Sequence, residues 1–166
     1  MIIDKQKHKK IMLDILSDIS ADPVLSVNLG FKGGTCVYFL YNLDRFSVDL
    51  DFDLLNIEKK KQVFDKIDLI LAKYGEVKNE GESRRKLKYS EESAMLKVDI
   101  SDRMEINVLN KYEVRDIVSG LPINVLSQKD IFAHKLVAIT DRYNKKTKNK
   151  IIVNRDLYDT NSYILP

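Results

Sequence analysis

Three aspartates recur at every second position near the middle of the chain, and this spacing constrains the fold more than any other feature of the sequence. Residues 46–52 alternate strictly between apolar and polar side chains, which predicts a β-strand. Because neighbouring side chains on a strand point to opposite faces, Asp49, Asp51 and Asp53 share one face, and the apolar residues between them face the core. Carboxylates crowded on one face repel each other, and a divalent cation relieves the repulsion. Two of them can hold Mg²⁺, with phosphate oxygens completing its coordination.

Two other interpretations of the aspartate strand have to be weighed. A calcium-binding loop also opens with alternating aspartates, but it needs glycine where Leu54 stands and a bidentate glutamate where Lys60 stands. The calcium loop is therefore excluded. An exposed acidic edge strand without any ligand fits the same alternation and stays open at this point.

A glycine turn precedes the aspartate strand. Gly33, Gly34 and Thr35 separate an expected strand over residues 24–31 from an expected helix over residues 35–43. The first amides of such a helix, and its partial positive charge, suit a phosphate group, to which Thr35 can add a hydroxyl. The spacing matches neither a P-loop nor a dinucleotide fingerprint, so an ordinary strand-to-helix turn is the alternative.

The remaining pattern predicts an α+β fold with a mixed sheet. Further helices are expected over residues 5–20, 57–74 and 128–143, and the last two follow the N-cap residues Asn56 and Ser127. Further strands are expected over residues 84–89, 95–100, 104–109, 113–118 and 123–126. This order of elements favours a sheet covered by helices mainly on one face.

Composition narrows the class of protein and the class of metal. A length of 166 residues suits one compact domain with a small helical appendage. A single cysteine, Cys36, excludes an internal disulfide and suits a reducing cytoplasm, and with only two histidines the chain is a poor zinc protein. The N-terminus has no secretory pattern, and no apolar run reaches membrane-spanning length. We therefore expect a cytoplasmic protein without a membrane partner, and a hard cation held by carboxylates.

The net charge of +3 is unevenly distributed along the chain. Basic clusters lie at residues 5–10, 59–61, 84–88 and 145–150, around the acidic strand. This arrangement suits a polyanionic substrate. Solvated helix ends and loops would give the same clusters.

The glycine turn and the aspartates together resemble the signature of the DNA polymerase β-like nucleotidyltransferase superfamily. A longer pattern resembles that of the AbiEii/AbiGii toxin family of abortive-infection systems. Its residues are Lys32, Gly33, Gly34, Thr35, Arg45, Ser47, Asp49, Asp51 and Phe52. The resemblance implies a polymerase β-like fold, with a mixed β-sheet flanked by helices. It also implies a nucleotidyltransferase core over residues 1–126 and a C-terminal helical segment over residues 127–166 that is shorter than in relatives.

The resemblance assigns site residues as well. The implied metal ligands are Asp49, Asp51 and Asp99. The implied nucleotide-binding residues are Lys32, Gly33, Gly34, Thr35, Arg45, Ser47 and Lys135. Asp49, Asp51, Asp99 and Lys135 form the implied catalytic set, in which Lys135 contacts the triphosphate. Asp53 receives no role. Arg142 and Arg155 belong to the segment that resembles the family, and the resemblance makes Asp156 and Asp159 site-adjacent or structural.

Two of these assignments have plainer alternatives. Asp99 shares the polar face of its expected strand with Lys97 and Ser101, and it would also fit a surface salt bridge involving that face. Lys135 lies beside the apolar stripe of its helix, where a lysine usually extends its ammonium to water.

The function implied by the resemblance is transfer of a nucleoside monophosphate from an NTP to an acceptor hydroxyl, with Mg²⁺ or Mn²⁺ as cofactor. The implied acceptor is RNA, at the 3′ end of tRNA, and the protein would be a toxin with a cognate antitoxin. One alternative is transfer to a protein hydroxyl, as in adenylylating relatives. The other is a catalytically silent binding module that has kept the fold.

Overall fold

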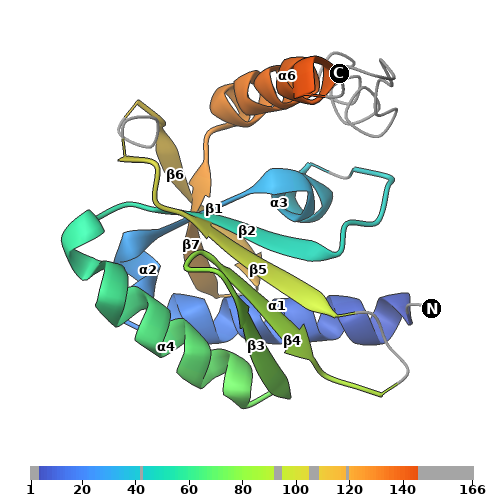
Figure 1. Ribbon diagram of the computed structural model, residues 1–166, viewed down its shortest axis with the longest axis vertical. Coiled ribbons are helices and arrows are strands. Elements are labelled where there is room, and N and C mark those ends of the chain that lie inside the picture. Colours follow the sequence, from blue (N-terminus) through green and yellow to red (C-terminus); the bar gives the residue numbers. More distant parts are fainter. Residues whose placement is uncertain (1–3, 42, 92–94, 105–108, 119, 146–166) are drawn as a thin grey trace.

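One mixed sheet organises the chain (Figure 1). The computed structural model describes residues 4–41, 43–91, 95–104, 109–118 and 120–145. Within them, the sheet order is β3-β4-β5-β2-β1-β7-β6. The helices are α1 (Lys5–Ala21), α2 (Leu25–Asn28), α3 (Gly33–Leu40), the 3₁₀ turn η1 (Ile57–Lys59), α4 (Lys60–Ala72) and α6 (Gln128–Lys145). The strands are β1 (Leu29–Lys32), β2 (Asp49–Leu54), β3 (Glu76–Glu80), β4 (Arg84–Lys88), β5 (Leu96–Ser101), β6 (Tyr112–Val118) and β7 (Leu121–Leu126).

The pairing of the central strands is mixed. β1 pairs antiparallel with β2 and parallel with β7, and β2 pairs parallel with β5. Parallel neighbours need long crossover connections, and here the chain between β2 and β5 supplies α4 and the hairpin β3–β4. The expected α+β architecture with a mixed sheet is confirmed.

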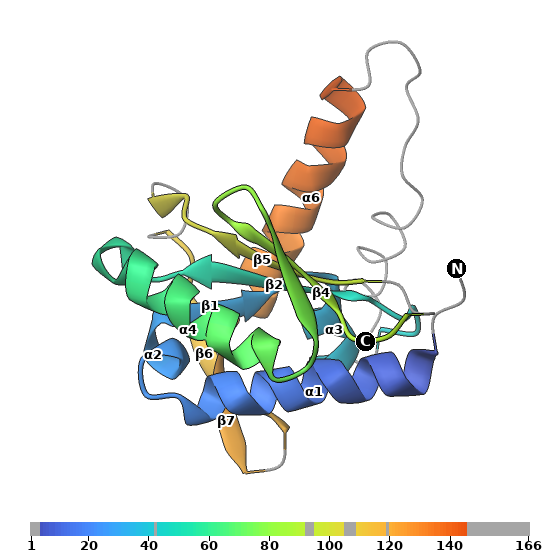
Figure 2. The same ribbon diagram turned by 60° about the horizontal axis from the view of Figure 1, so that its bottom comes forward.

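The hydrophobic core lies between the sheet and the helices α1 and α4, which cover the same face (Figure 2). The rings of Phe31 on β1 and Phe52 on β2 lie 5.3 Å apart, and both side chains are fully buried. Helix α1 buries Ile15 and Ile19 at helical spacing, as its sequence pattern predicted. Burial of this apolar surface is the main driving force for folding.

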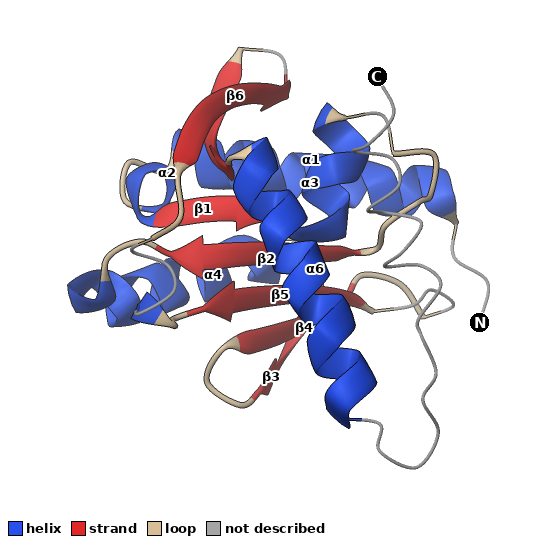
Figure 3. Cartoon of the chain, turned by 90° about the horizontal axis from the view of Figure 1, so that it is seen from above, coloured by secondary structure: helices blue, strands red, loops and turns tan. Residues whose placement is uncertain are grey.

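Helix α6 lies on the other side of the sheet from α1 and α4. Seen from above in Figure 3, it crosses over the central strands, and cavities of the structure are lined jointly by α6 and by β2. The sheet is therefore sandwiched at its centre, which corrects the expectation of helices mainly on one face. No helix in the described ranges combines the length and apolarity that crossing a bilayer requires.

A side-chain cap explains why one expected strand is shorter than its sequence pattern predicted. The sequence predicted a strand over residues 24–31, but its first half is the helical turn α2. The Asp22 carboxylate accepts hydrogen bonds from the amides of Val24 and Leu25, at 2.8 and 3.0 Å, and this cap starts the turn. The Asn28 side chain donates to the carbonyl of Val24 at 2.8 Å and closes it.

Three other expectations about elements have mixed outcomes. The N-caps Asn56 and Ser127 are confirmed by their hydrogen bonds to the turns that follow. The edge strand β3 was not predicted, because its sequence is charged and does not alternate. Of the strand expected over residues 104–109, positions 105–108 lie outside the described residues.

The cap of α6 gives a first prediction. The Ser127 hydroxyl accepts from the Asp130 amide at 3.3 Å, which caps the first turn, and it donates to the Asp130 carboxylate at 2.7 Å. We expect Ser127→Ala to lower the free energy of unfolding by about 1 kcal/mol, because an orphan amide of the first turn loses its acceptor. Urea denaturation measures this change. An unchanged midpoint would show that the cap contributes nothing.

Candidate active site

Four charged side chains form one row across the centre of the sheet. In the strand register, Lys32 of β1 lies opposite Asp51 of β2, Asp51 opposite Asp99 of β5, and Asp99 opposite Arg84 of β4. Directly paired residues lie on the same face of a sheet, so two carboxylates stand side by side between two cations. The two expected carboxylates from distant parts of the sequence are thus brought together.

Asp49 extends this group by one step along β2. It lies on the same face as Asp51, two residues away, and opposite Lys97 of β5. The structure therefore places the three expected metal-binding carboxylates on one patch of the polar face, with the predicted alternation of β2 intact.

The glycine turn is fitted closely against these carboxylates. Gly33 has a φ of 80°, and a Cβ atom added there would lie 2.2 Å from Oδ2 of Asp51. A Cβ atom on Gly34 would lie 2.9 Å from Oγ of Ser47. Only glycine allows the start of α3 to approach the Asp51 and Ser47 side chains this closely.

Thr35 has a different role from the one expected. Its side chain is fully buried, and its hydroxyl donates to the carbonyl of Asp49. The hydroxyl thus ties α3 to β2 and is engaged by the backbone, which differs from the direct phosphate contact that was expected. Thr35 positions Asp49 relative to the glycine turn.

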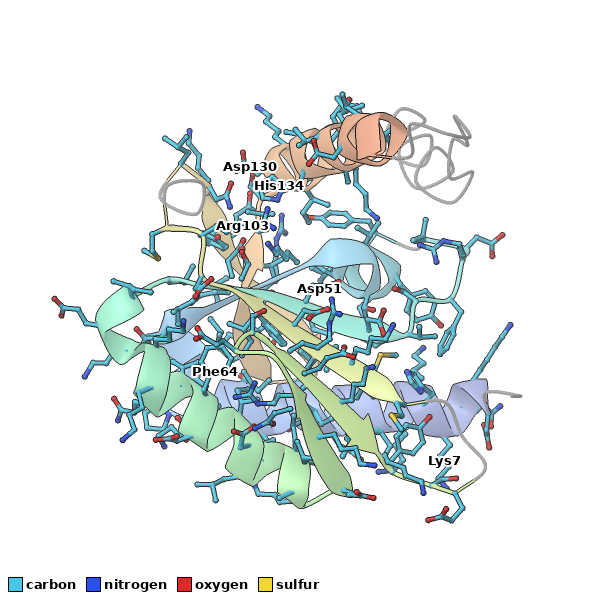
Figure 4. The ribbon with its side chains drawn as sticks, viewed as in Figure 1. Lys7, Asp51, Phe64, Arg103, Asp130 and His134 are labelled. Atoms are coloured by element: carbon cyan, nitrogen blue, oxygen red, sulfur yellow. The ribbon has the colours of Figure 1, made fainter. Side chains whose placement is uncertain are left out.

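A polar cleft of about 320 Å³ opens over the carboxylates. Its lining includes Gly34, Arg45, Ser47, Asp49, Asp51, Arg84, Asp99 and Lys135. Lys135 comes from α6, and Figure 4 shows that Asp51 lies on the side of the sheet that faces α6, whereas Phe64 lies on the opposite side. The cleft therefore combines carboxylates for a cation with arginine and lysine side chains for phosphate.

Lys32 faces further cavities beside this cleft. With Gly33 and Asp51 it lines a cavity of about 160 Å³ that continues along α6 past Ile131 and Ala138. It also lines a polar groove of about 320 Å³ towards Arg103 and Ser101 at the end of β5. Lys32 therefore stands where the cavities beside Asp51 meet.

The electrostatics of Asp51 are those of a crowded carboxylate. Burial, followed by the negative charges of Asp99 and Asp49, raises the pKa of Asp51 to about 6, and the charges of Lys32 and Lys135 only partly oppose this. The ionised form is therefore disfavoured in this site, and a divalent cation would remove the repulsion that disfavours it. An all-oxygen donor set of this kind fits a hard cation such as Mg²⁺.

Asp99 is engaged by an arginine. Its Oδ1 atom accepts a hydrogen bond from Nε of Arg84 at 2.7 Å, and Arg84 also pairs with Glu80 at 3.2 Å. Among the residues that the structure describes, no three histidine, cysteine or acidic side chains are already gathered as a metal site. Because Arg84 already binds Asp99, Asp49 and Asp51 are the carboxylates of this group that could hold a cation.

Sequence reasoning missed three residues around this site. The sequence marks Arg84 only as part of a basic cluster, and its pairing with Asp99 depends on the register of β4 and β5. The resemblance gives Asp53 no role, but Asp53 is buried in an ion pair with Lys32. On α6, His134 binds the Asn110 side chain at 3.0 Å, and burial, together with the charge of Lys32, lowers the pKa of this histidine.

Some expected residues cannot be compared with the structure. Arg155, Asp156 and Asp159 lie outside the described residues, and so does the side chain of Arg142. The expectation that Asp156 and Asp159 are site-adjacent or structural stays a prediction.

Solved structures of other proteins share this fold. JHP933 from Helicobacter pylori is 23% identical with a TM-score of 0.60, covering 96% of this chain and 66% of that protein. A second H. pylori structure is 25% identical with a TM-score of 0.61, covering 96% and 67%. MenT4, a nucleotidyltransferase toxin from Mycobacterium tuberculosis, is 20% identical with a TM-score of 0.64, covering 94% and 57%. This chain thus spans about two thirds of the length of the first two proteins and less of the third.

Sequence comparison gives the family directly. No curated protein sequence matches the chain significantly. Residues 14–164 match the family described as nucleotidyl transferase AbiEii toxin, type IV toxin–antitoxin system. Since this match takes in the glycine turn, the aspartate strand, Asp99 and α6, the chain belongs to the AbiEii nucleotidyltransferase toxin family.

Proposed function

We propose that this protein transfers a nucleoside monophosphate from an NTP to an acceptor hydroxyl, with a divalent cation held by Asp49 and Asp51. The observation that carries the proposal is the row of charges across β1, β2, β5 and β4 beneath a cleft with Arg45 and Lys135. Carboxylates for a cation and basic groups for a triphosphate are the two requirements of this reaction. Membership in the AbiEii family supports the same activity.

Residues at the start of α3 and on α6 would bind the triphosphate. The amides at Gly33 and Gly34, with the side chains of Arg45 and Ser47, bind the triphosphate at the start of α3. Lys135 lines the same cleft and neutralises charge on the departing pyrophosphate. Asp49 and Asp51 would hold the divalent cation, which would supply Lewis-acid stabilisation of the phosphates.

The transfer itself is an in-line displacement. The acceptor oxygen forms a bond to the α-phosphorus, the bond from that phosphorus to the bridging oxygen breaks, and pyrophosphate leaves. Because Arg84 binds Oδ1 of Asp99, we assign Oδ2 of Asp99 as the atom that takes the proton of the acceptor hydroxyl.

We further propose RNA as the acceptor, at the 3′ end of tRNA, and a cognate antitoxin as the protein partner. The groove that reaches Asp99 supports an acceptor with phosphates, because Lys32, Arg84 and Arg103 line it beside the carboxylates of Asp51, Asp99 and Asp102. Family membership in a type IV toxin–antitoxin system supports the antitoxin.

A labelling experiment tests the activity and the acceptor together. The protein is incubated with each of the four α-labelled NTPs, with Mg²⁺ or Mn²⁺, and with total RNA or total protein as acceptor. We expect label on tRNA-sized RNA, and we expect a chelator in excess over the metal to abolish it. Label on protein instead would favour adenylylation, and absence of label with all four nucleotides would contradict the proposed activity.

The pKa of Asp51 gives a prediction for metal binding. Because that pKa is raised to about 6, the side chain is protonated below this pH, and a proton then competes with the cation. We expect Mn²⁺ affinity to be constant above pH 7 and to fall by about tenfold for each pH unit below 6. Calorimetric titration with Mn²⁺ between pH 5 and 8 measures it. Unchanged affinity at pH 5 would exclude Asp51 as a ligand.

A further inference from the structure

The third aspartate of β2 is buried in a polar network of its own. Asp53 is 0% exposed, and its Oδ1 atom lies 2.5 Å from Nζ of Lys32, whose side chain is 20% exposed. Its Oδ2 atom accepts from the hydroxyl of Tyr112 at 2.9 Å and from the Asn110 amide at 3.3 Å. A carboxylate is stable at such a buried position only when it is paired and hydrogen-bonded, and Asp53 is both.

The strand register makes the pairing of Lys32 unusual. Lys32 lies directly opposite Asp51, whereas its ion-pair partner Asp53 is the diagonal neighbour on β2. A direct cross-strand neighbour is closer than a diagonal one, and Asp51 lines the same cavities as Lys32. The ammonium of Lys32 therefore reaches along the sheet, away from the carboxylate that faces it.

The space around Asp53 is shaped for this arrangement. Gly30 lies opposite Asp53 in the register, and a Cβ atom on Gly30 would lie 2.2 Å from the Tyr112 ring. The missing side chain thus lets the Tyr112 ring reach across β1, so that its hydroxyl binds Asp53. Asn110, which also binds Asp53, is in turn bound by His134 of α6 at 3.0 Å. Asp53 is consequently fixed from two sides.

We propose that Asp53 is a positioning residue that holds the Lys32 ammonium away from Asp51, so that Asp51 stays available to a divalent cation. This inference rests on the proposed function, because it assumes a cation at Asp51. Its physical basis is competition between cations: an ammonium paired with Asp51 would take the oxygen atoms that a metal ion needs.

Loss of the Asp53 charge should therefore redirect Lys32. In Asp53→Asn the lysine loses its charged partner, and Asp51 becomes the nearest carboxylate across the strand pair. Lys32 then pairs with Asp51 and opposes metal binding. Removing the lysine as well should relieve that opposition, which a merely structural role for Asp53 does not predict.

Binding of Mn²⁺ alone, without nucleotide, tests the inference. Calorimetry compares the wild type, Asp53→Asn, and the double variant Asp53→Asn with Lys32→Met. We expect Asp53→Asn to bind Mn²⁺ at least about tenfold more weakly, and the double variant to return to within about threefold of the wild type. Tyr112→Phe keeps the ion pair and loses one hydrogen bond, so as a matched control it should stay within about twofold.

The Mn²⁺ titrations distinguish failure of the proposed metal site from failure of the positioning role of Asp53. A wild type that binds no Mn²⁺ overturns the proposed metal site and the proposed function with it. A wild type that binds, together with an Asp53→Asn variant that binds equally well, overturns only the positioning role. A double variant as weak as Asp53→Asn also overturns it, because Lys32 is then not the competitor. Thermal unfolding confirms that each variant is folded, and Asp53→Ser removes the same charge if Asp53→Asn does not fold.

Discussion

Asp51→Asn is expected to lower the rate of nucleotidyl transfer by at least about a thousandfold, equivalent to about 4 kcal/mol of transition-state stabilisation. Asp51 stands at the centre of the charged row, between Lys32 and Asp99, and the glycine turn is fitted against its side chain. An amide keeps the shape of the side chain and removes the charge that a cation needs. Single-turnover transfer of label from an α-labelled NTP measures the loss.

The same substitution should stabilise the metal-free protein. The pKa of Asp51 is raised to about 6 in the folded protein, so at pH 7 its ionised form opposes folding. Asp51→Asn removes that charge, and we expect the free energy of unfolding to rise by about 1–3 kcal/mol at pH 7. For the wild type, protonation of Asp51 removes this unfavourable charge. The free energy of unfolding should therefore rise as pH falls through about 6. Urea denaturation in a chelating buffer measures both effects.

Asp116→Asn is the matched control for this prediction. Asp116 lies exposed on the edge strand β6 and lines none of the cavities around Asp51. Its replacement should change neither transfer nor stability by a measurable amount. If Asp51→Asn retained full transfer, the aspartate strand would not be the catalytic centre. If it lost both transfer and stability, the loss of activity would reflect unfolding.

Gly33→Ala is expected to lower transfer by at least about a hundredfold and stability by about 2–4 kcal/mol, because it combines backbone strain with a collision. The φ of 80° is unfavourable for any residue with a side chain, and the new methyl group would lie 2.2 Å from Oδ2 of Asp51. Either the start of α3 or the carboxylate must move. Transfer kinetics and urea denaturation of the same preparation measure the two effects.

Gly81→Ala separates the two causes. Gly81 has a similar φ of 73°, but a Cβ atom there meets no atom within 4 Å. In Gly81→Ala only the backbone strain should act. The free energy of unfolding should fall by about 1 kcal/mol, and the rate of transfer should be unchanged. If Gly33→Ala behaved like Gly81→Ala, the close contact between the glycine turn and Asp51 would have no functional consequence.

Local patterns in the sequence were enough to predict on which elements and faces many residues of the candidate site lie. Strict alternation placed Asp49 and Asp51 on the polar face of β2, and the apolar stripes predicted α1 and α4. The face that carries Asp99 followed from the same period-two rule. These features depend on neighbours within a few residues, which a single sequence records directly.

Features that depend on pairing between distant strands could not be predicted in the same way. The contact of Arg84 with Asp99 follows from the register of β4 and β5, and the burial of Asp53 follows from the approach of Tyr112 across Gly30. The helical turn α2 replaced half of an expected strand, because the Asp22 cap outweighed the weak alternation after it. A single sequence does not specify how distant strands pair, so these contacts are seen only in the structure.

The parallel pairing of β1 with β7, described above, has a consequence for synthesis of the protein. Phe31 pairs with Val125, and the helix that follows β7 carries Lys135, so the site combines residues made early with residues made near the end of the described chain. A ribosome that has translated only the glycine turn and the aspartate strand has not yet produced α6, which carries Lys135. Nucleotidyl transfer by the proposed mechanism would therefore begin only after α6 has left the exit tunnel and Lys135 can reach the cleft.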